Sequence, residues 1–577
     1  MIQTPQYPLR PLLWLLALLT ITACRPAIAA SNTPPASSPI PTAYPPTATH
    51  HSPPATAYPP PATLTPPATP TTAPTAVATA TPVPPPPTFA NPPDDNLGQT
   101  AVAFNAELIR PEPTNTGLWQ YTADSFIHPL ALVVGMGQDV AYLLDGGRVL
   151  ALNLAQPAPP EIVLAPGDVV EGVTVLEPLD LFAAPDGLLA LDRAGDVYRR
   201  DWGSQTWALD RYDRPISDKS SHYYVALDGA ANGRYLLETS YDYVLLYANG
   251  AQQALWVLPE ERGVDLVASG GSVYVLLQAM DTESGSLRLY RDTASVTSFR
   301  PPAIIHQPRQ VLADETAVYV LDENGRRLLV LAADSGRLLQ LWQMPTAVSA
   351  IGLTPQGDLL LAGRDRLYFA NQPQQLAAIG GGTPLSGAQP HDPDFLAGID
   401  GFVSPIGPNL AARDLQMPGA PRHYRLGVHQ GADFYWRLDS PVYAAADGTV
   451  IRATLDYAPP FPADFFAWQT ESQQLGYTSE AGLDFYRGRQ VWIEHTGGLV
   501  SRYIHLNSIA YGIQEGQPIA QGQLLGTVGN SGSPASLESA EADAHLHFEL
   551  WLGDHYVGQY LRPVETRYWL ERILLGK

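Results

Sequence analysis

Histidine and aspartate residues near the C-terminal end of the chain have the spacing of metal ligands. The segment 428–433, Val-His-Gln-Gly-Ala-Asp, places His429 and Asp433 four positions apart. Side chains two and four positions apart on a strand share a face, so both would point the same way, with Gly431 leaving room between them. Two suitable ligands beside an open space are what a metal ion requires.

Two later segments add three imidazoles. Polar and apolar residues alternate in one of them, so that His545 and His547 share one face of an expected strand while Leu546 and Phe548 share the other. The apolar pair would hold the strand in the core and leave both imidazoles facing a cleft. His505 lies in the sequence Tyr-Ile-His-Leu, where a second expected strand carries a single imidazole among apolar neighbours.

The types of these residues favour catalytic zinc. The chain has one cysteine, Cys24, which excludes an internal disulfide and a thiolate zinc cluster. Catalytic zinc uses three protein ligands and an open position for water, whereas these motifs offer four histidines and one aspartate. Imidazoles in excess of the ligands can orient or deprotonate the water and stabilise an oxyanion. A purely structural zinc fits this surplus poorly.

Taken in order, the motifs resemble the pattern of the M23 (LytM/lysostaphin-type) metallopeptidases: His-x-x-x-Asp, then Tyr-x-His-Leu, then a final His-x-His. The segment 440–450, SPVYAAADGTV, resembles a hairpin of that family, and 491–495 precedes a Gly-Gly turn as it does there. Segments 515–519 and 521–526 are similar to the Gly-Gln strands of the family. The resemblance covers roughly residues 400–565.

The resemblance implies a small, mostly antiparallel β fold with a groove over one Zn²⁺ ion per chain. It implies that His429, Asp433 and His547 bind the zinc and that His505 and His545 are the catalytic imidazoles. The implied activity is that of an endopeptidase acting on stem or bridge peptides of bacterial peptidoglycan. The alternative is a non-catalytic surface module that binds the cell wall or activates a separate hydrolase. The presence of all five positions favours the enzyme.

Two segments depart from the family pattern. An insertion at about 455–489 is rich in aromatic residues and is expected to wall or cap the groove. Residues 531–533 and the acidic stretch 538–543 replace a tight turn before the last motif. Both departures lie on loops, where specificity is normally set, so they bear on the substrate more than on the zinc. Of the remaining histidines in this part of the chain, we expect His495 to be structural and His423 and His555 to have surface or packing roles.

The elements preceding this domain, which we place at 396–577, are also predicted to be mainly β. Between 100 and 376, short apolar runs such as 140–145 and 317–322 recur at intervals of about 40 residues, the period of four-stranded propeller blades. We predict a six-bladed β-propeller, with a seventh irregular unit as an alternative, and a linker at 377–395. The ligand of the propeller is unknown: its surface is either a binding site or a rigid spacer.

The N-terminal residues 1–24 are predicted to be a signal peptide. An apolar run, 12–23, follows Arg10 and ends in Ile-Thr-Ala-Cys, which resembles the lipobox of bacterial lipoproteins and implies lipidation of Cys24. The alternative is cleavage after Ala29, which would release the protein. Either reading predicts export, with the lipid anchor placing the protein on the outer face of the membrane.

Residues 25–99 are rich in Pro, Thr and Ala and are predicted to form a disordered stalk with polyproline II character. The whole chain has 577 residues and a formal charge of −23. This acidity argues against a nucleic-acid partner and against electrostatic adhesion to anionic lipid, so the lipid anchor is the only predicted membrane contact.

Overall fold

The computed structural model describes residues 95–577 apart from short internal segments. The segments outside the description are 116–125, 136–138, 156–157, 211–222, 231–232, 240–242, 249–250, 259–260, 281, 292–293, 365, 373–374 and 382–388. The predicted signal peptide, Cys24 and most of the predicted stalk also lie outside the described residues. All described residues belong to one compact unit. None of the helices among them is long and apolar enough to span a membrane.

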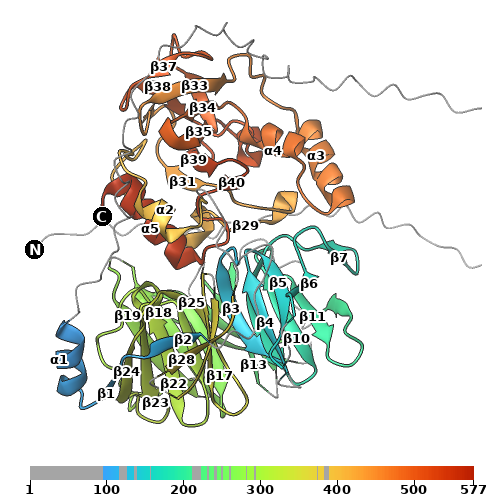
Figure 1. Ribbon diagram of the computed structural model, residues 1–577. Helices are drawn as coiled ribbons and strands as arrows, with labels where there is room; N and C mark the ends of the chain where they lie inside the picture. The colour runs from blue at the N-terminus through green and yellow to red at the C-terminus, as the bar shows by residue number, and fades with distance from the viewer. Residues whose placement is uncertain are drawn as a thin grey trace, which may run out of the picture. The chain divides into compact units, whose positions relative to one another are not determined.

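The described chain is mainly β, with many small sheets and no closed barrel. Between residues 107 and 381, which we call the sheet region, six sheets are each built from four antiparallel strands that follow one another in sequence (Figure 1). The first two comprise β3 (Pro129–Val134), β4 (Val140–Asp145), β5 (Arg148–Asn153) and β6 (Glu161–Leu164), then β9 (Pro178–Ala184), β10 (Gly187–Asp192), β11 (Val197–Asp201) and β12 (Trp207–Leu209). The next two comprise β13 (Tyr224–Ala230), β14 (Gly233–Glu238), β15 (Tyr243–Ala248) and β16 (Ala251–Val257), then β17 (Glu261–Ser269), β18 (Ser272–Ala279), β19 (Gly285–Arg291) and β20 (Ala294–Ser295). The last two comprise β21 (Gln310–Ala313), β22 (Ala317–Asp322), β23 (Arg327–Ala332) and β24 (Leu338–Gln343), then β25 (Val348–Leu353), β26 (Leu359–Gly363), β27 (Arg366–Gln372) and β28 (Gln375–Gly381).

The chain before these sheets contributes to their edges. After helix α1 (Asp95–Ala103), strand β1 (Glu107–Ile109) pairs in parallel with β24, and β2 (Glu112–Asn115) pairs in parallel with β28. Among the described residues, these N-terminal strands therefore extend two existing sheets. A separate two-stranded ribbon is formed by β7 (Val169–Val170) and β8 (Val173–Thr174).

The first strands of the six sheets lie beside one another in a closed order: β3, β9, β13, β17, β21, β25 and back to β3. A repeated hydrogen bond joins several of them. Asp180, Asp228 and Asp265 each lie on the first strand of a sheet and accept a backbone N–H from the first strand of the next sheet. Buried acceptors that satisfy backbone donors in this way hold the neighbouring sheets in register.

The predicted boundary at residue 376 falls inside a strand. Gly380 and Gly381, which look like part of a flexible linker in the sequence, pair with Leu367 and Arg366 as the end of β28. Glycine is tolerated there because the strand needs only backbone groups for its ladder. Helix α2 (Pro393–Ala397) then begins before the predicted start of the last domain.

Residues 391–577, which we call the C-terminal region, contain two further sheets (Figure 1). The larger runs β31 (Ala432–Tyr435), β39 (His545–Leu552), β35 (Leu499–Ile504), β34 (Val491–Glu494), β33 (Gly448–Ala453) and β37 (Pro518–Ile519), with β40 (His555–Tyr556) beside β39. The smaller runs β32 (Pro441–Tyr443), β38 (Leu524–Val528) and β36 (Leu506–Ile509), and a ribbon pairs β29 (Pro421–Arg422) with β30 (Gly427–Val428). Leu546, Phe548 and Leu550 of β39 are buried in the core of this region.

The aromatic insertion forms two helices, α3 (Pro462–Leu475) and α4 (Glu480–Arg487). A proline begins α3, and Gly476, in the left-handed conformation at φ 80°, ends it. Ser479 caps α4 by accepting a hydrogen bond from the Gly482 N–H. The two helices pack through aromatic contacts, among them an edge-to-face pair of rings whose centroids are 4.9 Å apart.

The last helix, α5 (Pro563–Leu575), and the residues before it contact the sheet region. Ion pairs between buried side chains lie at this contact: Arg193 with Glu177, Arg309 with Glu565, and both Arg262 and Arg567 with Asp414. We call these seven side chains the docking network. Arg193 also donates to the backbone carbonyl of Leu561. Buried charges of this kind need their partners, so the network ties the two regions together.

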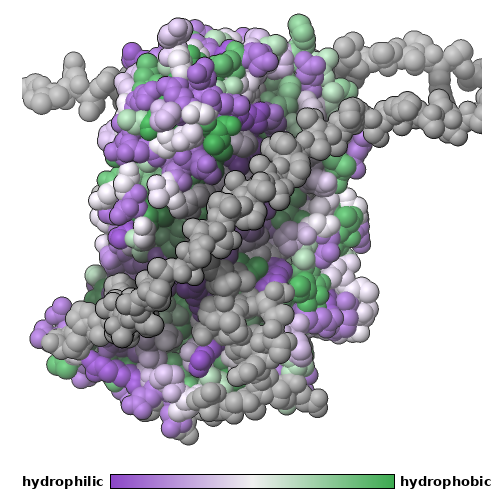
Figure 2. Space-filling view, turned by 45° about the horizontal axis from the view of Figure 1, so that its top comes forward, coloured by the Kyte–Doolittle hydropathy of each residue, from purple (hydrophilic) through white to green (hydrophobic). Residues whose placement is uncertain are grey.

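On the face shown in Figure 2, hydrophilic side chains predominate and hydrophobic ones form small scattered patches. No large hydrophobic patch is therefore visible among the described residues of this face.

Candidate metal centre

His429 and Asp433 converge, although they do not share one continuous strand as the sequence suggested. The chain leaves β30 after Val428, bends at Gly431 and enters β31 at Ala432. The bend brings His429 Nε2 to 3.0 Å from Asp433 Oδ1. A side chain at Gly431 would collide with the Phe548 carbonyl of β39 and lie 2.9 Å from the ring of His547. Glycine is therefore required for the close approach of the two segments.

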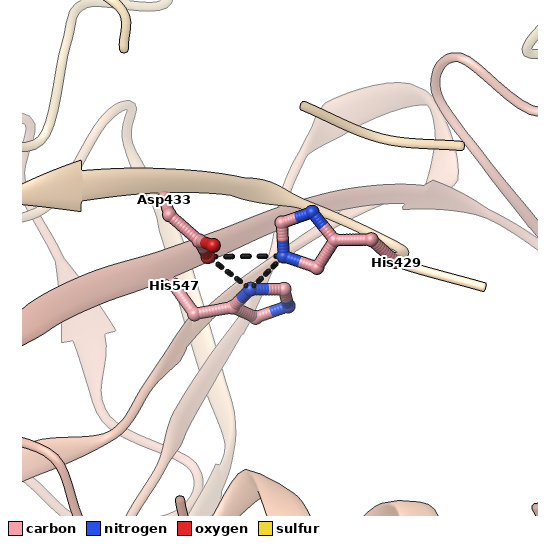
Figure 3. Close-up of side chains that lie close together, drawn as sticks. All are labelled: His429, Asp433 and His547. Atoms are coloured by element: carbon pink, nitrogen blue, oxygen red, sulfur yellow. Dashed lines mark hydrogen bonds and ion pairs between the residues drawn. The ribbon is translucent and has the colours of Figure 1, made fainter. Parts of the chain in front are cut away.

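Three ligand atoms of suitable type meet at one point (Figure 3). His547 Nδ1 lies 2.8 Å from both His429 Nε2 and Asp433 Oδ1. All three side chains are buried. Tetrahedral zinc with bonds of about 2.0–2.1 Å places its ligand atoms about 3.4 Å apart, so a small outward movement of these side chains would accommodate the ion. The donor set of two imidazoles and one carboxylate is one that zinc prefers.

The hydrogen bonds of the two rings orient their lone pairs. His429 Nδ1 donates to the Met417 carbonyl, and burial lowers the pKa of His429 to about 3, so the neutral ring presents a bare Nε2. His547 Nε2 donates to Glu549, which leaves Nδ1 facing Asp433 and His429. Burial opposes a charge on His547, but the hydrogen bonds to Asp433 and Glu549 raise its pKa. A positive charge is therefore favoured at this point, either as a proton or as a metal ion.

Charged side chains support the ligands from outside. Arg422 donates to the second oxygen of Asp433 at 3.0 Å. Glu549 accepts from Arg487, Arg502 and Trp551 in addition to His547. Burial would raise the pKa of Glu549, but Arg487 and the bond from His547 hold it well below its usual range. An ionised carboxylate behind a ligating histidine fixes its ring and increases its basicity.

His505 and His545 lie beside the three candidate ligands. His505 follows the end of β35 with a φ of 64°, so it occupies a left-handed position between two strands and not the interior of one as predicted. Its Nδ1 donates to the Ser531 carbonyl at 2.7 Å, and His545 Nδ1 donates to the Asp543 carbonyl at 2.6 Å. Both rings thus keep Nε2 available as an acceptor.

The two rings also interact with each other and with the ligands. Their centroids are 4.9 Å apart in an edge-to-face arrangement, and His545 Nε2 lies 3.7 Å from Asp433 Oδ1. Burial lowers the pKa of His505 well below its usual value, and the neighbouring His545 and His547 lower it further. His505 is therefore neutral at physiological pH. A non-glycine residue held at positive φ beside charged groups is strained, and such strain is typical of functional sites.

All five side chains border a cavity of about 380 Å³. The insertion contributes Leu483, Tyr486 and Arg487 to its wall, and the segment before the last motif contributes Ser533, Pro534 and Asp543. Both segments that depart from the family pattern therefore line the cavity. The insertion stands in the wall of the groove, one of the two positions expected for it.

The other histidines of this region have packing contacts. His495 is buried between the Asp447 carbonyl and the Ser501 hydroxyl, which fits the structural role predicted for it. His555 forms a hydrogen bond with Gln559. His423 lies in the cavity wall.

Several charged residues of this site were not among the candidate residues predicted from the sequence. Glu549 shares the period-two face of His545 and His547, so the alternation that identified the histidines would also have identified it. Arg425 and Arg487 carry no such signal, because their positions depend on how the insertion packs against the sheet.

Comparison with known proteins identifies the domain. The sequence model of peptidase family M23 matches residues 470–559. The C-terminal region thus carries an M23 peptidase domain, and the predicted resemblance is confirmed. The matched range includes His505, His545 and His547 and begins after His429 and Asp433.

Two curated proteins of Vibrio cholerae serotype O1 are similar to part of the chain. Peptidoglycan DD-endopeptidase ShyA is 28% identical over 126 residues, which cover 22% of this chain and 21% of that protein. Peptidoglycan DD-endopeptidase ShyC is 22% identical over 125 residues, covering 22% and 20% respectively. The chain thus spans about a fifth of the length of these relatives. Among solved structures, a glutaminyl cyclase of Myxococcus xanthus covers 45% of this chain and 94% of its own at 10% identity, with a TM-score of 0.25, too low to assign a shared fold.

Proposed function

We propose that this chain, through its M23 peptidase domain, is a zinc-dependent endopeptidase that cuts peptide bonds in bacterial peptidoglycan. The family match and the two peptidoglycan endopeptidases similar to this region support the reaction class and the substrate. Because those relatives are matched over only about a fifth of their length, the activity of the whole chain is part of the proposal.

One observation carries the proposal. A three-ligand group of His429, Asp433 and His547 lies in the same cavity as two imidazoles that are not needed as ligands. Their Nδ1 atoms are engaged by the carbonyls of Ser531 and Asp543, so His505 and His545 are oriented for chemistry at Nε2. A structural zinc site would have no use for such groups.

The proposed roles follow from this arrangement. Zinc held by the three ligands would polarise the scissile carbonyl and acidify a water molecule. Neutral His505 can accept a proton at Nε2 and later return it to the leaving amine. His545, held beside Asp433 and stacked on Tyr435 with ring centroids 5.0 Å apart, can donate a hydrogen bond from Nε2 to the developing oxyanion when protonated.

We also propose that the sheet region is a six-bladed β-propeller. Six four-stranded antiparallel sheets, whose first strands follow one another in a closed order, support this count. On this proposal it serves as a base for the peptidase domain, because the docking network occupies its contact with α5.

The remaining proposals concern location. The predicted signal peptide and the lipidation of Cys24 would place the protein on the outer face of the membrane. The predicted stalk would serve as a spacer, but it ends earlier than the predicted residue 99, because helix α1 begins at Asp95. Replacement of Cys24 by Ala is expected to abolish membrane retention of the exported protein. Unchanged retention in a fractionation experiment would favour release after Ala29.

The central experiment uses the full-length chain. We expect about one zinc per chain by metal analysis and the release of new amino groups from purified peptidoglycan. His545→Ala should retain zinc and lose activity. Stoichiometric zinc without activity on any of several wall types would instead favour the non-catalytic wall-binding or hydrolase-activating module.

A further inference from the structure

We propose that Arg425 forms a subsite that binds a carboxylate group of the peptide substrate beside the metal centre. The inference rests on the proposed peptidase function and names a specificity-determining residue for it. Four observations carry it: the burial of Arg425, its lack of an acidic partner, the backbone that makes room for its guanidinium, and the charge of the cavity.

Arg425 is buried without a carboxylate. Arg425 is one of the residues that line the cavity, and it is only 7% exposed. The guanidinium donates to the Val428 carbonyl at 2.9 Å and to the Thr478 hydroxyl at 3.3 Å, both neutral acceptors. No Asp or Glu of the described residues forms an ion pair with it. A buried guanidinium without a counter-ion is costly, and a ligand that supplies the negative charge offsets that cost.

Two neighbouring arginines of the cavity do have counter-ions. Arg422 pairs with Asp433, and Arg487 pairs with Glu549. Burial lowers the pKa of Arg425, and the charges of Arg422 and Arg487 lower it further. Arg425 therefore differs from both of these arginines, because no carboxylate of the described residues forms an ion pair with it.

The local backbone is shaped around this guanidinium. A Cβ at Gly427 would collide with Arg425 Nη1, so glycine leaves the space that the side chain occupies. Leu426 between them has a φ of 51°, a strained conformation for a residue with a branched side chain. Thr478 of the insertion holds the turn, because its N–H donates to the Leu426 carbonyl at 3.2 Å and its hydroxyl donates to the Arg425 carbonyl. Strain maintained by surrounding contacts indicates a built position.

The charge of the cavity contrasts with that of the chain. Four arginines and three carboxylates line the cavity before any metal is counted, in a chain with a formal charge of −23. A bound Zn²⁺ would make the cavity more positive. Such a site attracts an anionic ligand, and the planar fork of arginine binds a carboxylate with two parallel hydrogen bonds. The occupant we infer is a peptide with a free carboxylate near the scissile bond.

The test uses two synthetic cross-linked peptides that differ only in whether the acidic groups beside the scissile bond are free carboxylates or carboxamides. With full-length, zinc-loaded protein, we expect kcat/KM to be about 10- to 100-fold higher for the carboxylate peptide, the range for a charge-assisted hydrogen bond. Arg425→Gln should reduce this ratio to near one, mainly through KM, and Arg425→Lys should restore part of it. Arg452→Gln, which removes an arginine paired with Asp484 outside the cavity, should leave the ratio unchanged.

The outcomes separate the subsite from the proposed function. Equal cleavage of both peptides by the wild-type protein would overturn the inference, and so would an equal loss on both peptides in Arg425→Gln. If the wild-type protein cleaves neither peptide, the proposed function fails, and calorimetry then decides the subsite. Tighter binding of the carboxylate peptide than of the carboxamide peptide, with the difference abolished in Arg425→Gln, would support the subsite. Equal binding of both peptides would reject the subsite. The comparison of the two peptides requires only the wild-type protein. Equal cleavage of both would therefore overturn the inference even if Arg425→Gln folds poorly.

Discussion

Buried arginines occur in two regions of this protein, and they differ in what faces them. In the docking network, the guanidinium groups of Arg193, Arg262 and Arg309 lie against carboxylates at 2.6–3.0 Å. In the cavity, Arg425 is also buried, and its hydrogen-bond acceptors among the described residues are neutral. The arginines of the docking network have their counter-ions in the folded chain. The proposed subsite at Arg425 would gain its counter-ion when an anionic ligand binds. Charge compensation thus distinguishes a structural contact from a binding site.

The candidate metal centre, like Arg425, is arranged for a charged partner, and its preference for that charge is stronger. Asp433 accepts from Arg422 on one oxygen and turns the other to His429 and His547, where a positive charge is favoured. The proposed ligands would therefore be completed by a cation and Arg425 by an anion, and the described residues supply neither. The docking network requires neither.

Removing a proposed metal ligand should give the largest effect. His547→Ala deletes the atom that lies 2.8 Å from both other ligand atoms. We expect loss of bound zinc and a fall in kcat/KM on the order of 10³-fold or more. Metal analysis and the amino-group release assay measure the two effects. Full zinc and full activity in this variant would show that the ligand assignment is wrong.

Breaking the docking network should affect stability more than catalysis. Glu565→Ala leaves Arg309, which lies 3.0 Å away, buried without its counter-ion. We expect a loss of about 3–5 kcal/mol in the free energy of unfolding, measured by chemical denaturation, with zinc stoichiometry unchanged in the folded protein. A loss below about 1 kcal/mol would mean that the network does not join the two regions.

Weakening the support behind the proposed metal ligands should have a smaller effect than either of these changes. Glu549→Gln keeps the shape of the side chain but removes the charge that accepts from His547 Nε2. Weakened outer support of a ligating histidine commonly lowers metal affinity by about 10- to 100-fold. Competition with a zinc chelator measures this change. An unchanged affinity would mean that the Arg487–Glu549 pair acts only in packing.

How much of this could be predicted depends on whether a residue is placed by its own strand or by distant segments. The alternation of β39 predicted that Leu546 and Phe548 enter the core while His545 and His547 face the cavity. The meeting of His429 and Asp433 was also predicted, but the bend at Gly431 was not, because it is imposed by the close approach of β39.

Other positions gave no local signal. The left-handed conformation of His505 is not favoured by its sequence and depends on the strands on either side. Arg425 and Arg487 are positioned by contacts with the insertion and with β39, for which the sequence offers no pattern. Gly380 and Gly381 were misread as linker because strand pairing with β27 outweighs the flexibility of glycine. Tertiary contacts decided each of these cases.

Zinc binding should weaken as the pH falls. The pKa of His547 is raised by its hydrogen bonds to Asp433 and Glu549, so in the metal-free protein a proton occupies the ligand position below that pKa. Zinc must displace this proton, and the affinity should therefore decrease by about tenfold per pH unit below the pKa and become independent of this group above it. Chelator competition between pH 5 and 9 measures the slope. A flat profile would show that His547 carries no proton in the metal-free protein.

The smallest effect is expected at the partly exposed Arg452, and it tests whether burial is what distinguishes the effects of these arginines. Arg452 makes a two-pronged ion pair with Asp484 of α4, with both side chains partly exposed. Exposed pairs contribute about 0–1 kcal/mol because water screens the charges and the side chains lose freedom. Arg452→Gln should therefore change the free energy of unfolding by about that amount. The difference between the variant and the wild-type protein should become smaller at high salt. A loss above about 2 kcal/mol, or a changed preference between carboxylate and carboxamide peptides, would mean that this pair positions α4 and, through it, the wall that carries Arg487.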